Sequence, residues 1–173
     1  MKKTLILVRI ALFSAILAIL AQITIPLPTG VPITLQTFAV ALCGYCLNAK
    51  EGCISVVVYL MLGAVGIPVF SGFQGGISRL VGPTGGFLIG FVFLAWFCGI
   101  NFEKKPLKVI FGMIGLILCH LTGALQYAIL MKIDFLQSLL TVSVPFLIKD
   151  TISVAAAFFV SLAVSKVTRR YIL

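Results

Sequence analysis

The sequence predicts an all-α integral membrane protein, a bundle of six transmembrane helices with long outward-facing loops. Hydrophobic residues make up 61% of its 173 residues and charged residues only 10%, whereas soluble domains contain about 45–50% apolar and about 25% charged residues. The mean hydropathy is +1.24. No segment resembles an appended soluble domain, so residues 1–173 are expected to form a single transmembrane domain. The apolar runs cover residues 5–22, 35–47, 53–65, 85–100, 107–131 and 145–167.

The first two runs are separated by a segment that cannot be helical. The run at 5–22 follows Lys2 and Lys3 and resembles a signal peptide, but no small-residue cleavage site leads into polar sequence, so we expect a retained first helix. Residues 24–32 contain three prolines, and proline inside a helix removes a hydrogen bond and clashes with the preceding turn. The run at 35–47 therefore begins a second, short helix.

Polar and glycine-rich segments bound the third run. Residues 48–52 read Asn-Ala-Lys-Glu-Gly and predict a tight polar turn before the third helix at 53–65. Residues 66–86 hold seven glycines and two prolines, so this segment is expected to be non-helical. Non-helical backbone at membrane depth must be buried in protein or line a cavity.

Charged or polar connections separate the last three helices. Residues 101–106 form a charged loop between the fourth helix at 85–100 and the fifth at 107–131, and residues 132–138 form a polar connection to the sixth. Pro145 suits the first turn of that last helix, because the first N–H groups of a helix have no partner within it. The helix is expected to continue to residue 167.

Basic residues predict the orientation, because cytoplasmic loops of membrane proteins are enriched in Lys and Arg. With a cytoplasmic N-terminus, ten of the 13 basic residues lie inside and three outside, so both termini are expected in the cytoplasm. The inner residues are Lys2, Lys3, Arg9, Lys50, Lys104, Lys105, Lys108, Lys166, Arg169 and Arg170, and the outer residues are Arg79, Lys132 and Lys149. All long irregular segments then face outward, which is typical of a receptor for something that arrives from outside.

The net charge of +9 is explained by this topology. No basic patch with interleaved aromatic residues indicates a nucleic-acid partner. The apolar surface is expected to contact membrane lipid.

Two charged residues lie in segments that carry few other charges. Asp150 lies near the start of the sixth helix; a carboxylate at a membrane helix centre costs about 2.5–3.5 kcal/mol, which indicates a functional group. The helix dipole would also favour an aspartate near the helix N-terminus, without any function. Arg79 lies in the glycine-rich segment, where its guanidinium could hold a carboxylate through two hydrogen bonds or extend to the membrane surface.

Four further polar residues are candidates for a site. Gln36 and Thr37 open the second helix, and Tyr127 lies near the outer end of the fifth. Each could hydrogen-bond a ligand, or could only cap a helix or pack. Lys149 is adjacent to Asp150, but neighbouring helical residues do not share a face, so Lys149 can point away from it.

The sequence lacks the motifs of common catalytic and metal sites. It contains no G-x-x-x-x-G-K-[ST] loop and no Ser-His-Asp, Cys-His or paired-carboxylate set. His120 stands alone in the fifth helix and is interpreted as a packed or hydrogen-bonded residue. Cys43 and Cys46 form a C-x-x-C pair that no second pair completes into a zinc site, so they are interpreted as small residues on one helix face. We expect neither an enzyme nor a metal or cofactor site.

The first helix carries a strip of small residues along one face. Such strips let another helix approach closely. The strip is either a docking surface for a partner or a packing surface within the chain's own bundle. Its members, at spacings of three and four, are Ala11, Ser14, Ala15, Ala18 and Gln22.

Four segments resemble one family of membrane proteins. They are residues 33–40 (ITLQTFAV), 59–70 (YLMLGAVGIPVF), 75–76 (GG) and 82–87 (GPTGGF). The chain resembles the BioY family, the biotin-specific substrate-binding (S) components of energy-coupling-factor transporters, over nearly its whole length. The resemblance implies six helices, an outward pocket that binds biotin with high affinity, and a place in the cytoplasmic membrane of a bacterium or archaeon.

The resemblance also implies partners and biotin contacts. A small-residue face, here Ala11, Ala15 and Ala18, would dock onto a transmembrane coupling subunit that is driven by two ATPase subunits. Asp150 would accept hydrogen bonds from the ureido N–H groups of biotin. Either Arg79 or Lys149 suits the valerate carboxylate, and the sequence leaves open which cation meets which end. The rings expected to pack on the bicyclic ring are Phe70, Phe73, Tyr127 and Phe146.

One departure and two alternatives accompany this interpretation. The family usually has a lysine three residues after the aspartate, where this chain has Ser153. A solitary biotin facilitator would work without ATPase partners, and uptake by the chain alone would distinguish it. A membrane enzyme that acts on a lipid or peptide would need clustered catalytic groups on one face, and the sequence does not provide them.

Overall fold

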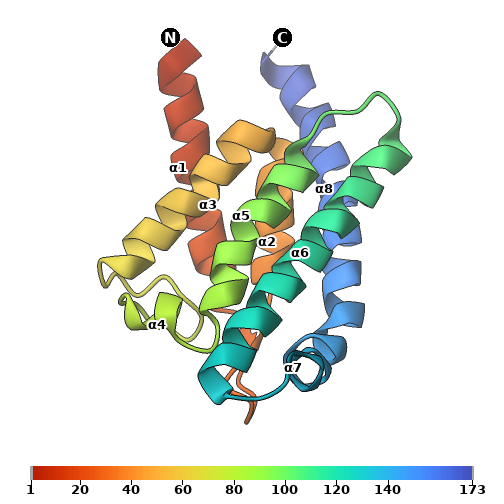
Figure 1. Ribbon diagram of the computed structural model, residues 1–173. Helices are drawn as coiled ribbons and strands as arrows, with labels where there is room; N and C mark the ends of the chain where they lie inside the picture. The colour runs from red at the N-terminus through yellow and green to blue at the C-terminus, as the bar shows by residue number, and fades with distance from the viewer. Residues whose placement is uncertain (1, 173) are drawn as a thin grey trace.

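The computed structural model describes residues 2–172, with the side chains of residues 3–166. The described chain is largely helical, as predicted, and its helices form one bundle (Figure 1). A two-stranded antiparallel hairpin, in which Thr24 pairs with Thr34 and Ile25 with Ile33, is one of the elements that the sequence did not predict. The elements are α1 (Lys2–Leu20), β1 (Thr24–Ile25), β2 (Ile33–Thr34), α2 (Gln36–Cys46), α3 (Ala49–Ala64), α4 (Ser78–Val81), α5 (Gly85–Gly99), α6 (Lys105–Met131), α7 (Phe135–Val142) and α8 (Val144–Ile172).

Within the described part of the chain, three helices are long and apolar enough to cross a membrane by length and composition. They contain the spans Lys3–Leu20, Lys105–Met131 and Val144–Lys166. A transmembrane helix needs about 20 apolar residues, and α2, α3 and α5 are shorter, with 11, 16 and 15 residues. The long helices support a membrane protein, and a total of six spans stays a prediction.

The short helix α2 occupies the centre of the bundle. It contacts α1, α3, α5 and α8, and eight of its eleven residues are buried. Small residues allow this close packing: a Cβ added to Gly44 would lie 2.5 Å from the carbonyl oxygen of Ala95 in α5. The surrounding core includes Leu17, Tyr59, Leu94 and Val154, which are all fully buried. Because α2 is enclosed by protein, its apolar run reflects a buried core helix.

The predicted polar turn at 48–52 is wrong, because α3 begins at Ala49. The side-chain oxygen of Asn48 accepts a hydrogen bond from the backbone N–H of Glu51 at 3.0 Å, as an N-cap residue does. Glu51 lies in the first turn, where the helix dipole favours a negative charge. The polar residues therefore start the helix, and only Leu47 and Asn48 separate it from α2.

The glycine-rich segment at 66–86 is mostly irregular, as predicted, but it includes the short helix α4 and the start of α5 at Gly85. Phe70 and Gln74 pair through two backbone hydrogen bonds of 2.8 and 3.2 Å. Between them, Gly72 adopts a φ of +72°, which glycine tolerates more readily than other residues. The segment thus forms a compact, folded cap.

Other boundaries differ from the predicted ones. The helix α6 begins at Lys105, inside the predicted loop at 101–106, and α7 occupies much of the predicted connection at 132–138. Asp134 starts α7, since its carboxylate accepts a hydrogen bond from Leu136 N–H at 2.8 Å. The bundle helices at the two ends run Lys2–Leu20 and Val144–Ile172, against the predicted 5–22 and 145–167.

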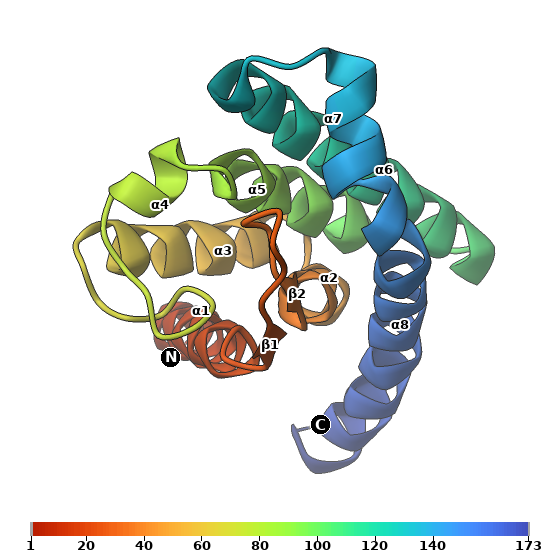
Figure 2. The same ribbon diagram turned by 90° about the horizontal axis from the view of Figure 1, so that it is seen from below.

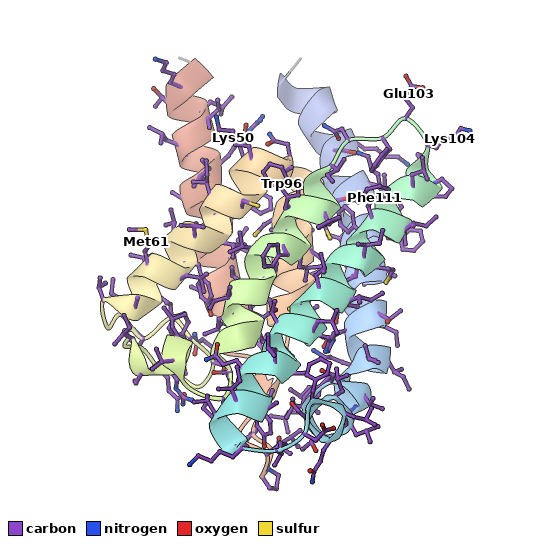
Figure 3. All side chains as sticks on the ribbon, viewed as in Figure 1. Lys50, Met61, Trp96, Glu103, Lys104 and Phe111 are labelled. Atoms are coloured by element: carbon purple, nitrogen blue, oxygen red, sulfur yellow. The ribbon has the colours of Figure 1, made fainter. Side chains whose placement is uncertain are left out.

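The two ends of the bundle differ in character. Both chain termini lie at one end (Figure 1), and Lys50, Glu103 and Lys104 also lie toward it (Figure 3). The hairpin, α4 and α7 lie at the opposite end, where the hairpin lies beside the end of α2 (Figure 2). Most of the predicted inner cations thus belong to the end with the termini, opposite the hairpin, α4 and α7. The side chains of Lys2, Arg169 and Arg170 lie outside the described residues, and the orientation in a membrane stays a prediction.

Candidate functional site

A cavity lies beneath the hairpin and the glycine-rich segment, at the end of the bundle that carries the irregular segments. Its free volume is about 60 Å³, room for roughly four to six water molecules. Residues far apart in the sequence form its wall, so the bundle itself assembles it. The lining residues are Val31, Pro32, Thr34, Gln36, Thr37, Phe70, Ser71, Gln74, Arg79, Thr84, Phe87, Leu88, Phe91, Leu116, Cys119, His120, Val142, Phe146, Lys149 and Asp150.

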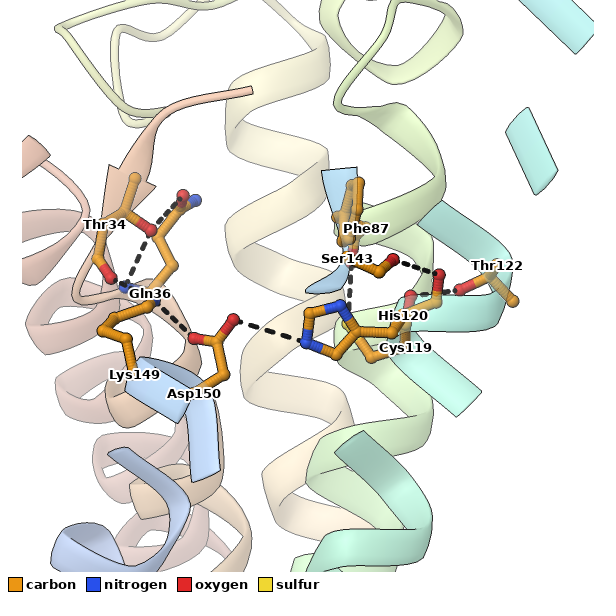
Figure 4. A network of polar contacts seen from close by, with 9 residues as sticks. All are labelled: Thr34, Gln36, Phe87, Cys119, His120, Thr122, Ser143, Lys149 and Asp150. Carbon is orange, nitrogen blue, oxygen red and sulfur yellow. Dashed lines mark hydrogen bonds and ion pairs between the residues drawn. The ribbon is translucent and has the colours of Figure 1, made fainter. Parts of the chain in front are cut away.

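The carboxylate of Asp150 is the buried charge of this cavity. Its residue is 5% exposed and lies in the second turn of α8. One carboxylate oxygen contacts the ammonium of Lys149, and the other lies 3.4 Å from Nε2 of His120 on α6 (Figure 4). An isolated buried charge is very unfavourable, and pairing with hydrogen bonds offsets its cost. The two basic neighbours therefore keep an ionised carboxylate at the cavity wall.

The side chain of Lys149 does not point away from Asp150, contrary to expectation. The side chains of neighbouring helical residues leave the helix in different directions. The four-carbon stem of Lys149 nevertheless lets its Nζ reach the carboxylate. Nζ also donates a 2.9 Å hydrogen bond to the carbonyl oxygen of Thr34 in β2. Lys149 thus connects α8 to the hairpin over the cavity.

The start of α2 contributes a short hydrogen-bond chain. The Thr34 hydroxyl donates to the Gln36 side-chain oxygen at 3.1 Å, and the Gln36 amide nitrogen donates to the Tyr59 hydroxyl at 2.8 Å. Both ends of the Gln36 amide are therefore engaged and its orientation is fixed. Thr37, the next residue, also lines the cavity.

Arg79 reaches the cavity from α4 and is half-buried. It also lines an outer groove between the hairpin and residues 71–74, so it stands where the cavity opens outward. Among the described side chains it takes part in no ion pair. Gln126 of α6 holds this segment in place, because its amide nitrogen donates to the carbonyl oxygens of Leu80 and Gly82 at 2.9 and 2.8 Å.

The predicted aromatic residues divide between the cavity and its surroundings. Phe70 lines the cavity and packs edge-on against Tyr59, with ring centroids 5.4 Å apart. Phe73 is 72% exposed and lies outside the lining. Tyr127 is buried in one apolar cluster with Phe146, and its hydroxyl donates to the Thr29 carbonyl oxygen at 3.2 Å. Tyr127 thus supports the loop between the two strands instead of facing the cavity.

The sequence indicates that His120 is a packed or hydrogen-bonded residue, and the structure places it beside Asp150 in the cavity wall, a position that the sequence did not predict. The only available signal was its position as the single histidine of the chain, seven residues before Tyr127 on the same face of an apolar helix. The proximity of His120 to Asp150, 30 residues away, depends on how α6 and α8 are rotated about their axes. Ser153, at the position where the sequence departs from its family, lines an apolar groove between α2 and α8 on the outside of the cavity wall.

The strip of small residues on α1 faces two directions. Ala11 and Ala15 are exposed, and Ala18 is partly buried against the core. Ser14 faces the bundle and donates a 2.8 Å hydrogen bond to the Ser55 carbonyl oxygen. Gln22 also faces inward, where it donates to the Val69 carbonyl oxygen and accepts from the Phe73 N–H. Only part of the strip is therefore open to a partner helix.

Comparisons with known proteins identify relatives of this chain. A curated relative from Thermotoga maritima, "Biotin transporter BioY", is 37% identical over 163 residues, covering 92% of this chain and 95% of the relative. Another from Pyrococcus horikoshii, "Probable biotin transporter BioY", is 36% identical over 152 residues, covering 88% of this chain and 91% of the relative.

A solved structure has the same fold as this chain. It is described as the "Crystal structure at 2.1 A of the S-component for biotin from an ECF-type ABC transporter". The two share a TM-score of 0.87 and 28% identity, over 95% of this chain and 93% of that one. The model of the BioY family, a family of transporters and not a class of enzymes, matches residues 1–170. This chain belongs to the BioY family.

Proposed function

We propose that this chain is the high-affinity biotin-binding S component of an ATP-driven energy-coupling-factor transporter. The observation that carries the proposal is the cavity with a buried Asp150 carboxylate at its inner wall and Arg79 at its outer opening. Such a cavity fits a small ligand with hydrogen-bond donors at one end and an anionic group at the other. Biotin, with its ureido N–H groups and its carboxylate, has this arrangement, and the named relatives are biotin transporters.

The contacts favour one orientation of biotin. Lys149 is already paired with Asp150 and bonded to the Thr34 carbonyl oxygen. Arg79 has no ion pair among the described side chains, and a guanidinium can hold a carboxylate through two hydrogen bonds. We therefore assign the valerate carboxylate to Arg79 and the ureido ring to Asp150. The bicyclic ring would pack between Phe70 and Phe146, which both line the cavity.

Binding requires the cap of the cavity to move. The free volume of about 60 Å³ holds only a few waters, much less than a bicyclic vitamin occupies. The segments that close the cavity are the hairpin loop and the glycine-rich segment, which both line the cavity and the outer groove. Their displacement would open the path past Arg79, and their return would enclose the ligand.

Transport would require partners in the cytoplasmic membrane. The exposed Ala11 and Ala15 on α1 offer a smooth face that another helix can approach closely. A transmembrane coupling subunit with two ATPase subunits would dock there, with both termini of this chain in the cytoplasm and the cavity facing outward. The likeness to an S component of an ECF-type ABC transporter supports these partners.

The test is whether the chain, purified in detergent without any partner, retains biotin. We expect tight retention at a stoichiometry near one, and absence of binding would end the proposal. A second measurement concerns uptake in cells that lack the coupling subunit and the ATPases. Biotin uptake by the chain alone would favour the solitary facilitator, whereas uptake only with the partners supports the S-component function.

A further inference from the structure

We propose that His120 is a ligand-contacting residue of this cavity, in which Nε2–H holds Asp150 and Nδ1 accepts a hydrogen bond from an N–H group of the ligand. The inference deepens the proposed function and rests on it. It assigns one ureido N–H of the ligand to α8, through Asp150, and the other to α6, through His120.

The position of the imidazole is fixed on two sides. His120 is 5% exposed, and its Nε2 lies 3.4 Å from Oδ2 of Asp150 (Figure 4). The ring meets the ring of Phe87 edge-on, with centroids 5.8 Å apart and an interplanar angle of 87°. Phe87 and Asp150 line the same cavity as His120. The ring is thus held in one orientation at the wall.

The second ring nitrogen is buried and has no partner. Nδ1 of His120 forms no hydrogen bond with any described residue, and Figure 4 shows it on the side of the ring turned away from Asp150. Buried polar groups in proteins are nearly always hydrogen-bonded, so each exception needs an explanation. A donor that arrives with a ligand, once the cap has moved, explains why this nitrogen stays unpaired within the protein.

Charge determines which hydrogen-bonding role Nδ1 has. Lys149 neutralises Asp150, and Arg79 adds a positive charge to the lining, so a protonated imidazole would add a further uncompensated charge, which is unfavourable. In the neutral imidazole one nitrogen donates and the other accepts. Because Nε2 faces a carboxylate, it carries the proton, and Nδ1 is the acceptor.

The resulting site presents two acceptors on two different helices. A carboxylate oxygen of Asp150 and Nδ1 of His120 would each receive one N–H donor. This pattern fits the two N–H groups of a cyclic urea. It disfavours ring ligands with an oxygen or sulfur in place of either nitrogen, because a buried acceptor would then lose its donor.

Two substitutions separate the roles of the two nitrogens. His120→Gln can place an N–H near the position of Nε2 and keep the contact with Asp150, but it removes Nδ1. His120→Asn keeps a polar atom near the position of Nδ1 but is too short to reach Asp150. Leu121→Ala, at an exposed position on the same helix, is the control. Each variant is checked for a monodisperse elution profile and for thermal stability in detergent.

The ligands are biotin and its two ureido N-methyl derivatives, each of which lacks one N–H donor. We expect His120→Gln to bind biotin about tenfold to a hundredfold more weakly than the wild type. One N-methyl derivative should bind the wild type weakly, because it lacks the N–H that donates to Nδ1. Its affinity should not fall further in His120→Gln, which lacks the acceptor of the same hydrogen bond. His120→Asn should retain sensitivity to that methyl group.

Three outcomes would overturn the assignment while biotin binding by the wild type stands. The first is wild-type affinity for biotin in a folded His120→Gln protein. The second is that each methyl group weakens binding by the same factor in the wild type as in His120→Gln. The third is weakened biotin binding in His120→Asn but not in His120→Gln, which would mean that His120 only supports Asp150. If His120→Asn does not fold, His120→Gln and the two derivatives decide the question. A wild type that binds no biotin would instead refute the proposed function, and the inference with it.

Discussion

At the scale of single residues, the cavity depends on a polar cluster of three neighbours. Asp150 contacts Lys149 and His120, so each substitution in the cluster leaves a buried partner without its counter-charge or its hydrogen bond. Removing one member of a buried pair costs more than the pair contributes, because the remaining charge is uncompensated. Effects on ligand binding and on folding must therefore be measured separately.

We predict that Asp150→Asn weakens biotin binding by about 2–5 kcal/mol, a loss of roughly thirtyfold to a few thousandfold in affinity. The asparagine retains the shape but loses the charge-assisted acceptor and adds a competing donor. Calorimetric titration of the purified protein measures the loss. The double variant Asp150→Asn with Lys149→Gln should recover thermal stability without recovering affinity. A folded Asp150→Asn protein that binds like the wild type would remove Asp150 from the site.

Arg79 gives a prediction that depends on the chemistry of the ligand. If Arg79 reads the carboxylate, Arg79→Ala should weaken biotin by about 1.5–3 kcal/mol, as for a hydrogen bond to a charged group, and should barely affect the uncharged amide of biotin. The ratio of the two affinities in the wild type and the variant is the measurement. Equal weakening of both ligands would show that Arg79 only shapes the segment around α4.

At the scale of elements, the polar residues in the predicted connections serve as helix caps. Asn48 begins α3, and Asp134 begins α7, although both residues lie in segments that the sequence indicated as connections. Side-chain oxygens at these positions satisfy backbone N–H groups that the helix leaves unpaired. On α1, burial divides the small residues into an inward part, which includes Ser14, and an exposed part with Ala11 and Ala15.

The exposed part of α1 allows a prediction that separates binding from transport. Ala15→Trp adds bulk to an exposed position, so biotin affinity and thermal stability should stay near wild type. Co-purification with the coupling subunit and ATP-driven uptake should be lost, because the partner helix can no longer approach the backbone. Ile117→Trp, at an exposed position on α6, is the control for added bulk at the lipid surface.

Two results would contradict the docking role of α1. A loss of biotin retention and of expression together in Ala15→Trp would indicate overpacking inside the bundle, which typically costs about 1–3 kcal/mol. Normal assembly and normal uptake would show that no partner helix contacts this position.

At the scale of the whole molecule, the two ends of the bundle differ in structure and in charge. The hairpin, α4, α7 and the cavity lie at one end, and both termini lie at the other (Figure 1). Basic residues such as Lys50 and Lys104 lie toward the end with the termini (Figure 3). This separation agrees with the Lys and Arg bias that orients membrane proteins.

The orientation is tested by single cysteines introduced into a variant whose five native cysteines are replaced. We expect membrane-impermeant thiol reagents to label Lys50→Cys and Lys104→Cys only from the cytoplasmic side and Gln74→Cys only from outside. The reagents are applied to intact cells and to inverted vesicles. Labelling of all three positions from the same side would contradict the orientation.

Much of the architecture follows from the sequence alone. Hydropathy determines that the chain is a membrane bundle, because 61% hydrophobic residues cannot be covered by a polar surface in water. Proline and glycine determine where helices stop, since their effect on backbone conformation is local. Asp150 and Arg79 could be selected as candidates because charge is rare in such a chain and unfavourable in lipid.

Only the tertiary structure decided which residues form the cavity. His120 meets Asp150 and Lys149 reaches the Thr34 carbonyl oxygen, while Phe73 and Tyr127 lie outside the lining. These outcomes depend on the rotation of each helix about its axis, on the reach of long side chains and on the path of the loops. Hydropathy and spacing describe a single helix at a time, so they determine which residues are buried but not which of them meet.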